Sequence, residues 1–116
     1  MQYLLLIYSN ENDEPRPGTP EGDAHMNAYY KFTEEVQQKK LHLGGNALNS
    51  VSTATTVRVR DSKTQTTDGP FAETKEQLGG YYLLDCKDLD EAIACAAKIP
   101  SAKFGSVEVR PVMVFE

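Results

Sequence analysis

Residues 68–81 read DGPFAETKEQLGGY and join two segments whose patterns predict β-strands. The stretch opens with Asp-Gly-Pro, a combination that is typical of a tight turn. It closes with Gly79 and Gly80, which permit a β-bulge or a close approach of the backbone to a helix or a ligand. Carboxylates and a lysine lie between these ends, so the stretch is too specific for an ordinary connection, and the rest of the chain is interpreted around it.

The N-terminal part of the chain predicts a strand, a loop and a helix. Residues 2–8 form a nearly continuous apolar run, which is typical of a strand inside a sheet. Residues 9–18 are rich in polar residues and proline and predict a loop. Thr19 is a capping hydroxyl followed by a proline, so we expect a helix from there to about Lys40. The inner stripe of this helix is expected to hold His25, Tyr29, Phe32 and Val36.

The middle of the chain predicts a β-hairpin and a further strand. Residues 55–60 alternate in the manner of a strand, residues 61–63 have turn chemistry, and residues 64–67 form a short returning strand. Residues 81–86 predict another strand after the stretch described above. A weaker pattern, after the glycines that end the first helix, predicts a strand at residues 47–51.

A second helix and a last strand complete the chain. Asp88 and Glu91 have the spacing of a capping box, and Pro100 is expected to end the helix that follows. Residues 107–115 alternate as a strand, and Pro111 within it predicts an edge position or a bulge. The inner stripe of the second helix is expected to hold Leu89, Ala92, Ile93 and Ala96.

The order of these elements predicts an α+β fold of the ferredoxin-like, or split βαβ, type. In such a fold two helices cover one face of an antiparallel sheet. The aromatic residues on the strands exceed what one helical layer needs, so we expect a second copy to cover the other face in a homodimer. The aromatic residues in question are Tyr3, Tyr8, Tyr81, Tyr82 and Phe115.

The composition fits one soluble domain that spans residues 1–116. A net charge of -5 argues against a protein that binds nucleic acid non-specifically and is compatible with a cytoplasmic location. Cys86 and Cys95 lack the spacing of a metal site and are expected to be reduced thiols in the core. The apolar N-terminus has no basic segment before it, and no run is long enough to cross a membrane.

The stretch at residues 68–81 resembles the signature of the DGPF-domain proteins, a branch of the YCII-related superfamily. Four other segments agree with this resemblance in the same order, namely residues 3–8, 54–58, 88–92 and 107–111. The resemblance implies a dimeric α/β-barrel assembly of ferredoxin-like domains. It also implies a link to extracytoplasmic-function sigma factors, because genes of this kind are often found beside or fused to theirs.

The resemblance further suggests a chemistry, since one enzyme of the wider superfamily is a dehydrochlorinase and YCII relatives carry a His-Asp pair proposed to be catalytic. In those relatives the histidine lies on the first helix. Counted back from the glycines after the helix, it falls nearer Ala28 or Tyr29, about one turn from His25. No aspartate of this chain is an obvious partner for His25.

Three titratable residues are candidates for acid–base catalysis, and each has a structural alternative. His25 lies near the start of the helix stripe, where it is either a catalyst or a satisfied helix histidine. Asp68 is either a carboxylate at the mouth of a cleft or the residue that starts the turn. Glu73 either points into a pocket or belongs to a solvated loop.

Four further residues are candidates for substrate binding. Lys75 either pairs with Glu73 or binds an anion, and Tyr29 shares the helix stripe with His25. Arg110 either clamps a carboxylate in a bidentate manner or pairs with Glu108 or a neighbouring strand. Arg58, on the alternating strand, has the same two options.

These candidates leave three hypotheses open. The first is a small enzyme that transfers a proton or eliminates a group from an acidic or aromatic compound, with no cofactor and no metal. The second is a non-catalytic ligand-binding or regulatory dimer linked to a sigma factor. The third is that the stretch at residues 68–81 has only a structural role and supports the dimer. The sequence contains no phosphate-loop or dinucleotide-binding motif, and His25 and His42 lack the spacing of a metal pair.

Overall fold

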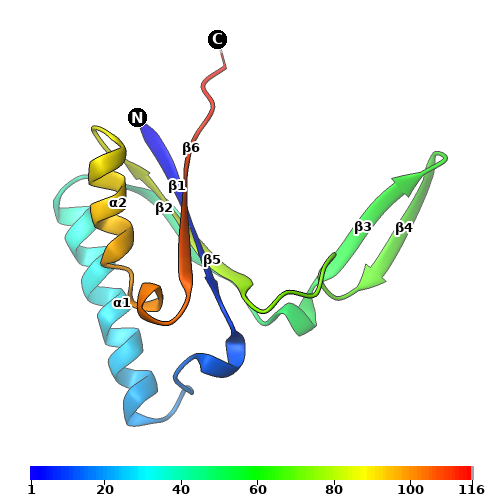
Figure 1. The fold of residues 1–116 in the computed structure, drawn as a ribbon, viewed down its shortest axis with the longest axis horizontal. Helices are drawn as coiled ribbons and strands as arrows, with labels where there is room; N and C mark the ends of the chain where they lie inside the picture. The colour runs from blue at the N-terminus through cyan, green and yellow to red at the C-terminus, as the bar shows by residue number, and fades with distance from the viewer. Residues whose placement is uncertain (116) are drawn as a thin grey trace.

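The structure is a computed structural model that describes residues 1–115 (Figure 1). Its helices and strands are β1 (Gln2–Ser9), α1 (Pro20–Gln38), β2 (His42–Ala47), β3 (Thr55–Arg60), β4 (Lys63–Asp68), β5 (Gln77–Asp85), α2 (Leu89–Ala97) and β6 (Ser106–Pro111). Three short 3-10 turns lie between them, η1 (Glu11–Asp13), η2 (Val51–Thr53) and η3 (Pro100–Lys103). Within the described residues, no helix is both long and apolar enough to span a membrane.

Four strands form the main sheet in the order β2-β5-β1-β6, and every neighbouring pair is antiparallel. Both helices lie on one side of this sheet (Figure 1). The predicted ferredoxin-like α+β fold is therefore confirmed. Strand β6 is an edge strand and ends at Pro111, as expected for a residue that cannot donate a ladder hydrogen bond.

Local side-chain contacts explain where both helices begin. The Thr19 hydroxyl accepts a hydrogen bond from the Gly22 amide at 3.0 Å, so α1 starts at the predicted cap. The Asp88 carboxylate accepts from the Glu91 amide at 2.9 Å, and the Glu91 carboxylate accepts from the Lys87 amide at 2.9 Å. These are the reciprocal contacts of a capping box, except that Glu91 accepts from the amide of Lys87 rather than from that of the cap residue Asp88.

The core lies between the helices and the sheet and contains Phe32 and Val36, as predicted. The expected stripe of α2 is partly wrong, because Leu89 and Ile93 are about half exposed. The buried residues of this region are Ala92, Cys95, Ala96 and Ile99. Leu89 and Ile93 therefore lie on the flank of the helix rather than on the side that faces the core.

Three predicted strand boundaries need correction. The strand expected at residues 47–51 lies earlier, at His42–Ala47, and includes the glycines interpreted as the end of the first helix. Position 45 requires glycine, because a Cβ atom there would lie only 2.7 Å from the Tyr81 carbonyl oxygen of the neighbouring strand. Strand β5 begins at Gln77 rather than residue 81, and the last strand ends at Pro111 rather than Phe115.

The glycine pair of the opening stretch forms a bulge, as predicted. Ile7 pairs with Gly80 and Tyr8 pairs with Leu78, so Gly79 is an extra residue in β5. A Cβ atom at Gly80 would lie 2.9 Å from the Asn46 carbonyl oxygen. The predicted bulge is therefore present, and the close approach is to strand β2 rather than to a helix or a ligand.

The sheet face away from the helices is uncovered in the single chain. We call it the open sheet face and define it by Leu4, Leu6, Tyr8, Tyr81 and Leu83, which alternate with the buried residues of β1 and β5. These side chains are half-buried. Of the other aromatic residues expected on this face, Tyr3 and Tyr82 point to the helices instead, and Phe115 lies exposed in the tail after β6.

Strands β3 and β4 form a separate two-stranded sheet, as the hairpin pattern predicts. Asp61 and Ser62 make the turn, with left-handed φ angles of 51° and 63°. The hairpin diverges from the main sheet on the side away from the helices (Figure 1). We call residues 55–68 the arm.

Cys86 and Cys95 are both free and buried, as predicted. Burial raises the pKa of the Cys86 thiol to about 11. Between the ordinary thiol pKa and this value, the unfolded chain loses a proton that the folded chain keeps. We therefore expect the free energy of unfolding to fall as pH rises through this window, by at most about 1.4 kcal/mol per pH unit. Urea titrations across the window measure the slope.

A Cys86→Ala variant is the control for this slope. It removes the titrating thiol and is expected to make the fall shallower. Part of the fall remains, because burial also raises the pKa of Cys95 and Tyr29. Identical slopes in the two proteins would contradict the assignment to Cys86.

Candidate functional site

A cleft of about 490 Å³ lies between α1 and the sheet. One wall comes from the N-terminal half of α1 and the floor from β2 and β5. The loop after β1 closes one end with Glu14. The residues that carry polar or aromatic chemistry into the cleft are Glu14, His25, Tyr29, Thr33, His42 and Tyr82.

The α1 wall is built around His25 and Tyr29, which lie one turn apart on the same stripe. Their rings meet edge to face with centroids 5.1 Å apart, and Phe104 packs on the other side of His25 at 5.7 Å. The Tyr29 hydroxyl shares a hydrogen bond of 2.6 Å with the buried hydroxyl of Ser101. Burial raises the pKa of Tyr29, so its hydroxyl stays protonated at neutral pH and can act as a hydrogen-bond donor.

The floor of the cleft is organised by Tyr82. Its ring packs edge to face on Phe32 at 5.0 Å, and its hydroxyl shares a hydrogen bond of 2.7 Å with Thr33 on α1. Burial raises the pKa of Tyr82 as well. His42, at the start of β2, approaches the same ring at 6.1 Å. The floor is therefore aromatic, with hydroxyl and imidazole groups along its margin.

Glu14, in the loop before α1, supplies the cleft with a carboxylate from outside the helix. The Ser9 hydroxyl donates a hydrogen bond to Glu14 at 2.6 Å, and this contact holds the loop across the end of β1. The negative charge of Glu14 also contributes, weakly, to raising the pKa of Tyr29. A carboxylate, an imidazole and a phenol thus line one cleft, which is the set of groups that acid–base chemistry requires.

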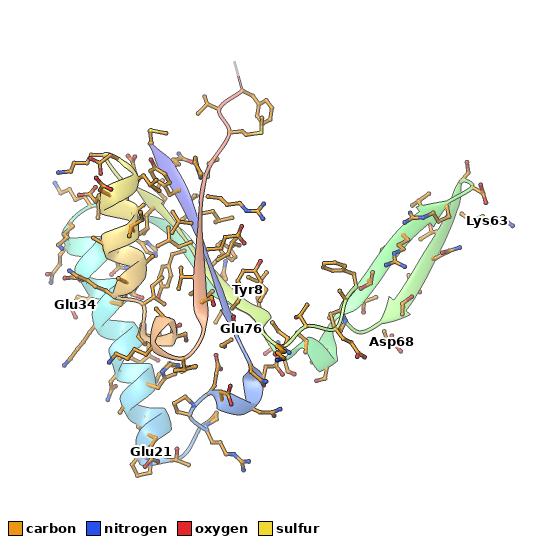
Figure 2. The ribbon with its side chains drawn as sticks, viewed as in Figure 1. Tyr8, Glu21, Glu34, Lys63, Asp68 and Glu76 are labelled. Carbon is orange, nitrogen blue, oxygen red and sulfur yellow. The ribbon has the colours of Figure 1, made fainter. Side chains whose placement is uncertain are left out.

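Two of the predicted site residues, His25 and Tyr29, line this cleft. The cleft does not include Asp68, Glu73, Lys75 or Arg58, which belong to the arm and the segment after it. Figure 2 shows Asp68 at the base of the arm, far from Glu21 and Glu34 on α1. Within one chain, the structure therefore separates the predicted catalytic residues into two groups.

The turn after the arm is held by the backbone. Gly69 has a left-handed φ of 100°, which favours glycine, and its amide donates to the Ala54 carbonyl oxygen at 2.7 Å. The Thr56 hydroxyl donates to the Gly69 carbonyl oxygen at 2.8 Å. Among the described residues, no amide of this turn donates to the Asp68 carboxylate, and the Gly69 amide is satisfied by the Ala54 carbonyl oxygen instead.

The predicted ion pairs have different outcomes. Arg110 pairs with Glu108 on the open-face side of β6, which is one of the two roles expected for it. Lys75 and Glu73 form no ion pair within residues 1–115. Glu76 instead accepts a hydrogen bond of 2.8 Å from Ser106, which attaches the end of the stretch to β6.

Four cleft residues were missed by sequence reasoning, namely Glu14, Thr33, His42 and Tyr82. His42 begins β2, a strand that the sequence predicts only later in the chain, and packs against Tyr82. Thr33 has a usable signal, because it lies four residues after Tyr29 on the helix. Glu14 has none, because its position depends on the path of an irregular loop.

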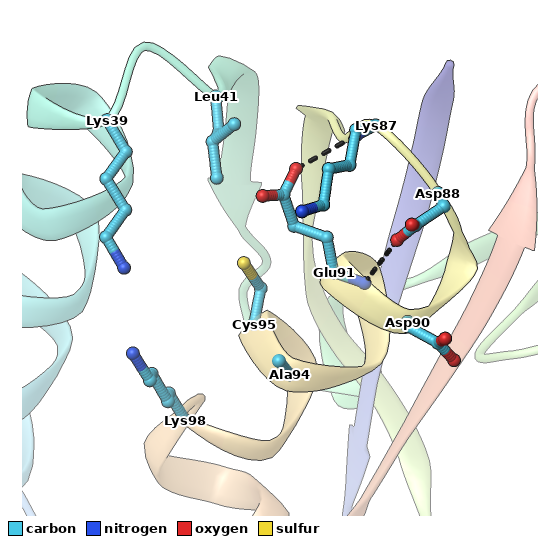
Figure 3. A pocket seen from close by; sticks show the side chains of 9 residues that line it. All are labelled: Lys39, Leu41, Lys87, Asp88, Asp90, Glu91, Ala94, Cys95 and Lys98. Atoms are coloured by element: carbon cyan, nitrogen blue, oxygen red, sulfur yellow. Dashed lines mark hydrogen bonds between the residues drawn. The ribbon is translucent and has the colours of Figure 1, made fainter.

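A second depression, of about 460 Å³, lies between the end of α1 and α2 (Figure 3). Its charged groups already serve the helices. Asp88 and Glu91 cap α2, and Lys98 donates to Glu35 of α1 at 3.0 Å. In the part of the chain that the structure describes, no cluster of three or more histidine, cysteine or acidic side chains could hold a metal ion.

A model of the YCII-related domain matches residues 1–116. The chain belongs to the YCII-related family. One protein similar to this chain is the uncharacterized protein R00369 of Rhizobium meliloti (strain 1021), which is 37% identical over 122 residues. That alignment covers 100% of this YCII-related chain and 95% of the relative.

A solved structure shares the fold of this YCII-related protein. It is 5-chloro-2-hydroxyhydroquinone dehydrochlorinase (TftG) from Burkholderia phenoliruptrix AC1100 in complex with 2,5-dihydroxybenzoquinone. The two superpose with a TM-score of 0.55 over 97% of this chain and 94% of the other, at 14% sequence identity. At this level of identity the likeness shows the fold alone.

Proposed function

We propose that this YCII-related protein is a small cofactor-independent enzyme that transfers a proton, or eliminates a group, on a small aromatic or acidic compound bound in the cleft. The observation that carries the proposal is the cleft itself, where Glu14, His25 and Tyr29 meet an aromatic floor. Sites of this kind, concave and largely apolar with a few polar groups, are where small ligands bind.

Each group in the cleft has a role in such a reaction. His25 and Glu14 are the two groups that exchange protons, one as base and the other as acid. In an elimination the base removes a proton from carbon, the leaving group departs with its bonding electrons, and the carbon–carbon double bond forms from the electrons of the C–H bond. Tyr29 and Tyr82 stay protonated and donate hydrogen bonds to ligand oxygen atoms. The ring of Tyr82 offers a surface for a planar ligand.

The structural neighbour suggests which compounds to try first. It is a dehydrochlorinase of a hydroxylated aromatic compound and was solved with a quinone. The aromatic floor of the present cleft is suited to a ring of that size. Dihydroxybenzoquinones and hydroxylated aromatic acids are therefore the first ligands for a binding screen.

We expect His25→Gln and Tyr29→Phe each to weaken binding of 2,5-dihydroxybenzoquinone by about tenfold, because each removes one polar contact in the cleft. Isothermal titration calorimetry measures the dissociation constants, and circular dichroism checks the fold. Asp68→Asn and Glu73→Gln are the matched controls outside the cleft and are expected to bind as the wild type does. Loss of binding in these two, with His25→Gln unaffected, would transfer the site to the stretch at residues 68–81.

We also propose a cytoplasmic homodimer in which the open sheet faces of two copies pack together. The support is the row of half-buried apolar side chains on β1 and β5 that no element of the single chain covers. Leu4, Leu6 and Leu83 are aliphatic residues of the kind that a permanent interface buries.

A non-catalytic regulatory dimer, with a sigma factor as partner, is the second candidate. The exposed arm favours it, since a protein that acts only on a small molecule does not need such a surface. Product analysis of a ligand that binds distinguishes the two candidates. Binding without any conversion, together with capture of a purified extracytoplasmic-function sigma factor, supports the regulatory function.

A further inference from the structure

The arm is a regular element with almost no support from its own chain. Its strands pair only with each other, and all of its residues except Thr56 are exposed to solvent. The hydrogen bonds at its base, from Thr56 to Gly69 and from Gly69 to Ala54, join residues within and beside the hairpin. None of them attaches the arm to the main sheet.

A hairpin in this situation is marginal in water, because an isolated pair of strands buries too little surface. The turn does not compensate for this. Asp61 and Ser62 both have left-handed φ angles, and in such two-residue turns Asn-Gly is the favoured sequence. The arm lacks a glycine at either position, so its order requires contacts beyond those of the single chain.

The two faces of the arm differ in chemistry. Val57 and Val59 pair with Thr66 and Thr64, so the outer part of one face is made of β-branched side chains, with Asp68 at its base, and each valine is 60% exposed. The opposite face carries three cations and one amide, from Arg58, Arg60, Lys63 and Gln65. An antiparallel sheet with such an alternation packs its apolar face and exposes its polar one.

We propose that the arm docks its Val57–Val59 face on a second copy of this chain, so that in a two-fold dimer the arm of each copy packs on the other. The arm diverges from its own sheet and cannot cover its own open sheet face (Figure 1). A copy related by a two-fold axis receives the arm and offers its own in return, which closes the assembly.

The chain also has exposed apolar residues outside the arm that such a dimer contact would bury. Phe71, just beyond the arm, is 79% exposed, and in the tail after β6 Met113 is 74% and Phe115 is 84% exposed. Exposed apolar groups gathered on protruding segments indicate a protein interface. All of them lie on segments that project from the body, which is the arrangement that two interlocking copies bury.

Charge also favours a second copy as the occupant. The arm has a net charge of +1, from three cations and the carboxylates of Asp61 and Asp68, whereas the rest of the chain has a net charge of -6. A body of the same kind therefore attracts the arm, and the cations, on the face opposite the valines, orient its approach without being buried. A nucleic acid would engage the cationic face and leave the valines in water. The assembly goes beyond the proposed function, because the cleft is complete in one chain.

The test compares two double variants of the full chain with the same added charge. Val57→Asp with Val59→Asp places two carboxylates on the docking face. Gln65→Asp with Thr67→Asp places two on the opposite face. Sedimentation velocity over a range of concentrations measures the dimer dissociation constant. We expect the first variant to dimerise about tenfold or more weakly than the wild type and the second to stay within about threefold.

Hydrogen exchange reports directly on the arm. Amides of the arm that are not paired within the hairpin are expected to gain protection as the wild-type protein dimerises, and to stay unprotected in the variant at Val57 and Val59. Equal weakening by both variants, or arm amides that exchange freely in the wild-type dimer, would overturn the proposal. Binding of a duplex oligonucleotide that is lost on replacing Arg58, Arg60 and Lys63 with serine would also overturn it. Ligand titration of the cleft in both variants keeps this result separate from the proposed function.

Discussion

Replacing Ile99 with alanine is expected to lower the free energy of unfolding by about 2–5 kcal/mol. Ile99 is 1% exposed and lies in the core just after α2. Removing its methyl and methylene groups loses their burial and leaves a cavity that packed neighbours fill only in part. Urea denaturation of the wild type and the variant at one protein concentration measures the difference.

Ile93→Ala is the matched control for this prediction. Ile93 is 50% exposed on the flank of α2, so the same atoms are removed from a site that water already reaches. Alanine is the better helix former, and we expect the change to stay below about 1 kcal/mol. Losses of equal size at the two positions would contradict the orientation of α2 described above.

Gly105→Ala is expected to cost about 3 kcal/mol or more, at or beyond the upper end of the usual range for overpacking. A Cβ atom there would lie 2.2 Å from the Tyr8 carbonyl oxygen and 2.9 Å from the Ser9 Cβ atom. Both neighbours belong to β1, a central strand that is held by β5 and β6 on its two sides. The strand cannot move aside without losing ladder hydrogen bonds, so thermal and urea denaturation should both show the loss.

Gly44→Ala separates the effect of contact from that of adding a methyl group. Gly44 also lies in the sheet, but a Cβ atom there meets nothing within 4 Å. The change in the free energy of unfolding is expected to stay within about 0.5 kcal/mol in either direction. A large loss in Gly44→Ala would show that the backbone, rather than the contact with β1, requires glycine.

The fold could be predicted because its signals are local. Thr19 and Asp88 each cap a helix through a contact three residues away, and the alternation at residues 55–60 needs no knowledge of the rest of the chain. The strand at His42–Ala47 could not be placed, because its glycines are required by contact with β5, which is distant in sequence. The prediction of the buried side of α2 was partly wrong because this helix has apolar residues on several sides. Contacts with the rest of the chain determine which side is buried.

The candidate site could be predicted only where one helix carries it. His25 and Tyr29 share a stripe because of helical geometry, so the sequence alone brings them together. The stretch at residues 68–76 attracted attention through its composition, which says nothing about the direction in which a loop leaves the sheet. Glu14 and His42 reach the cleft by tertiary contacts alone. The roles predicted for Asp68 and Glu73 stay predictions, and the binding panel above tests them.

The bulge at Gly79 decides which side of the sheet each residue of the opening stretch enters. Residues directly opposite in the ladder share a side, so Gly80 faces the helices with Ile7 and Leu78 faces away with Tyr8. Strict alternation from Gly80 would have sent Leu78 toward the helices and Gln77 away from them. One inserted residue thus reverses the phase of β5 and divides the strand between two tasks. Residues 79–82 of the strand line the cleft, whereas Leu78 faces the outer surface beside Tyr8.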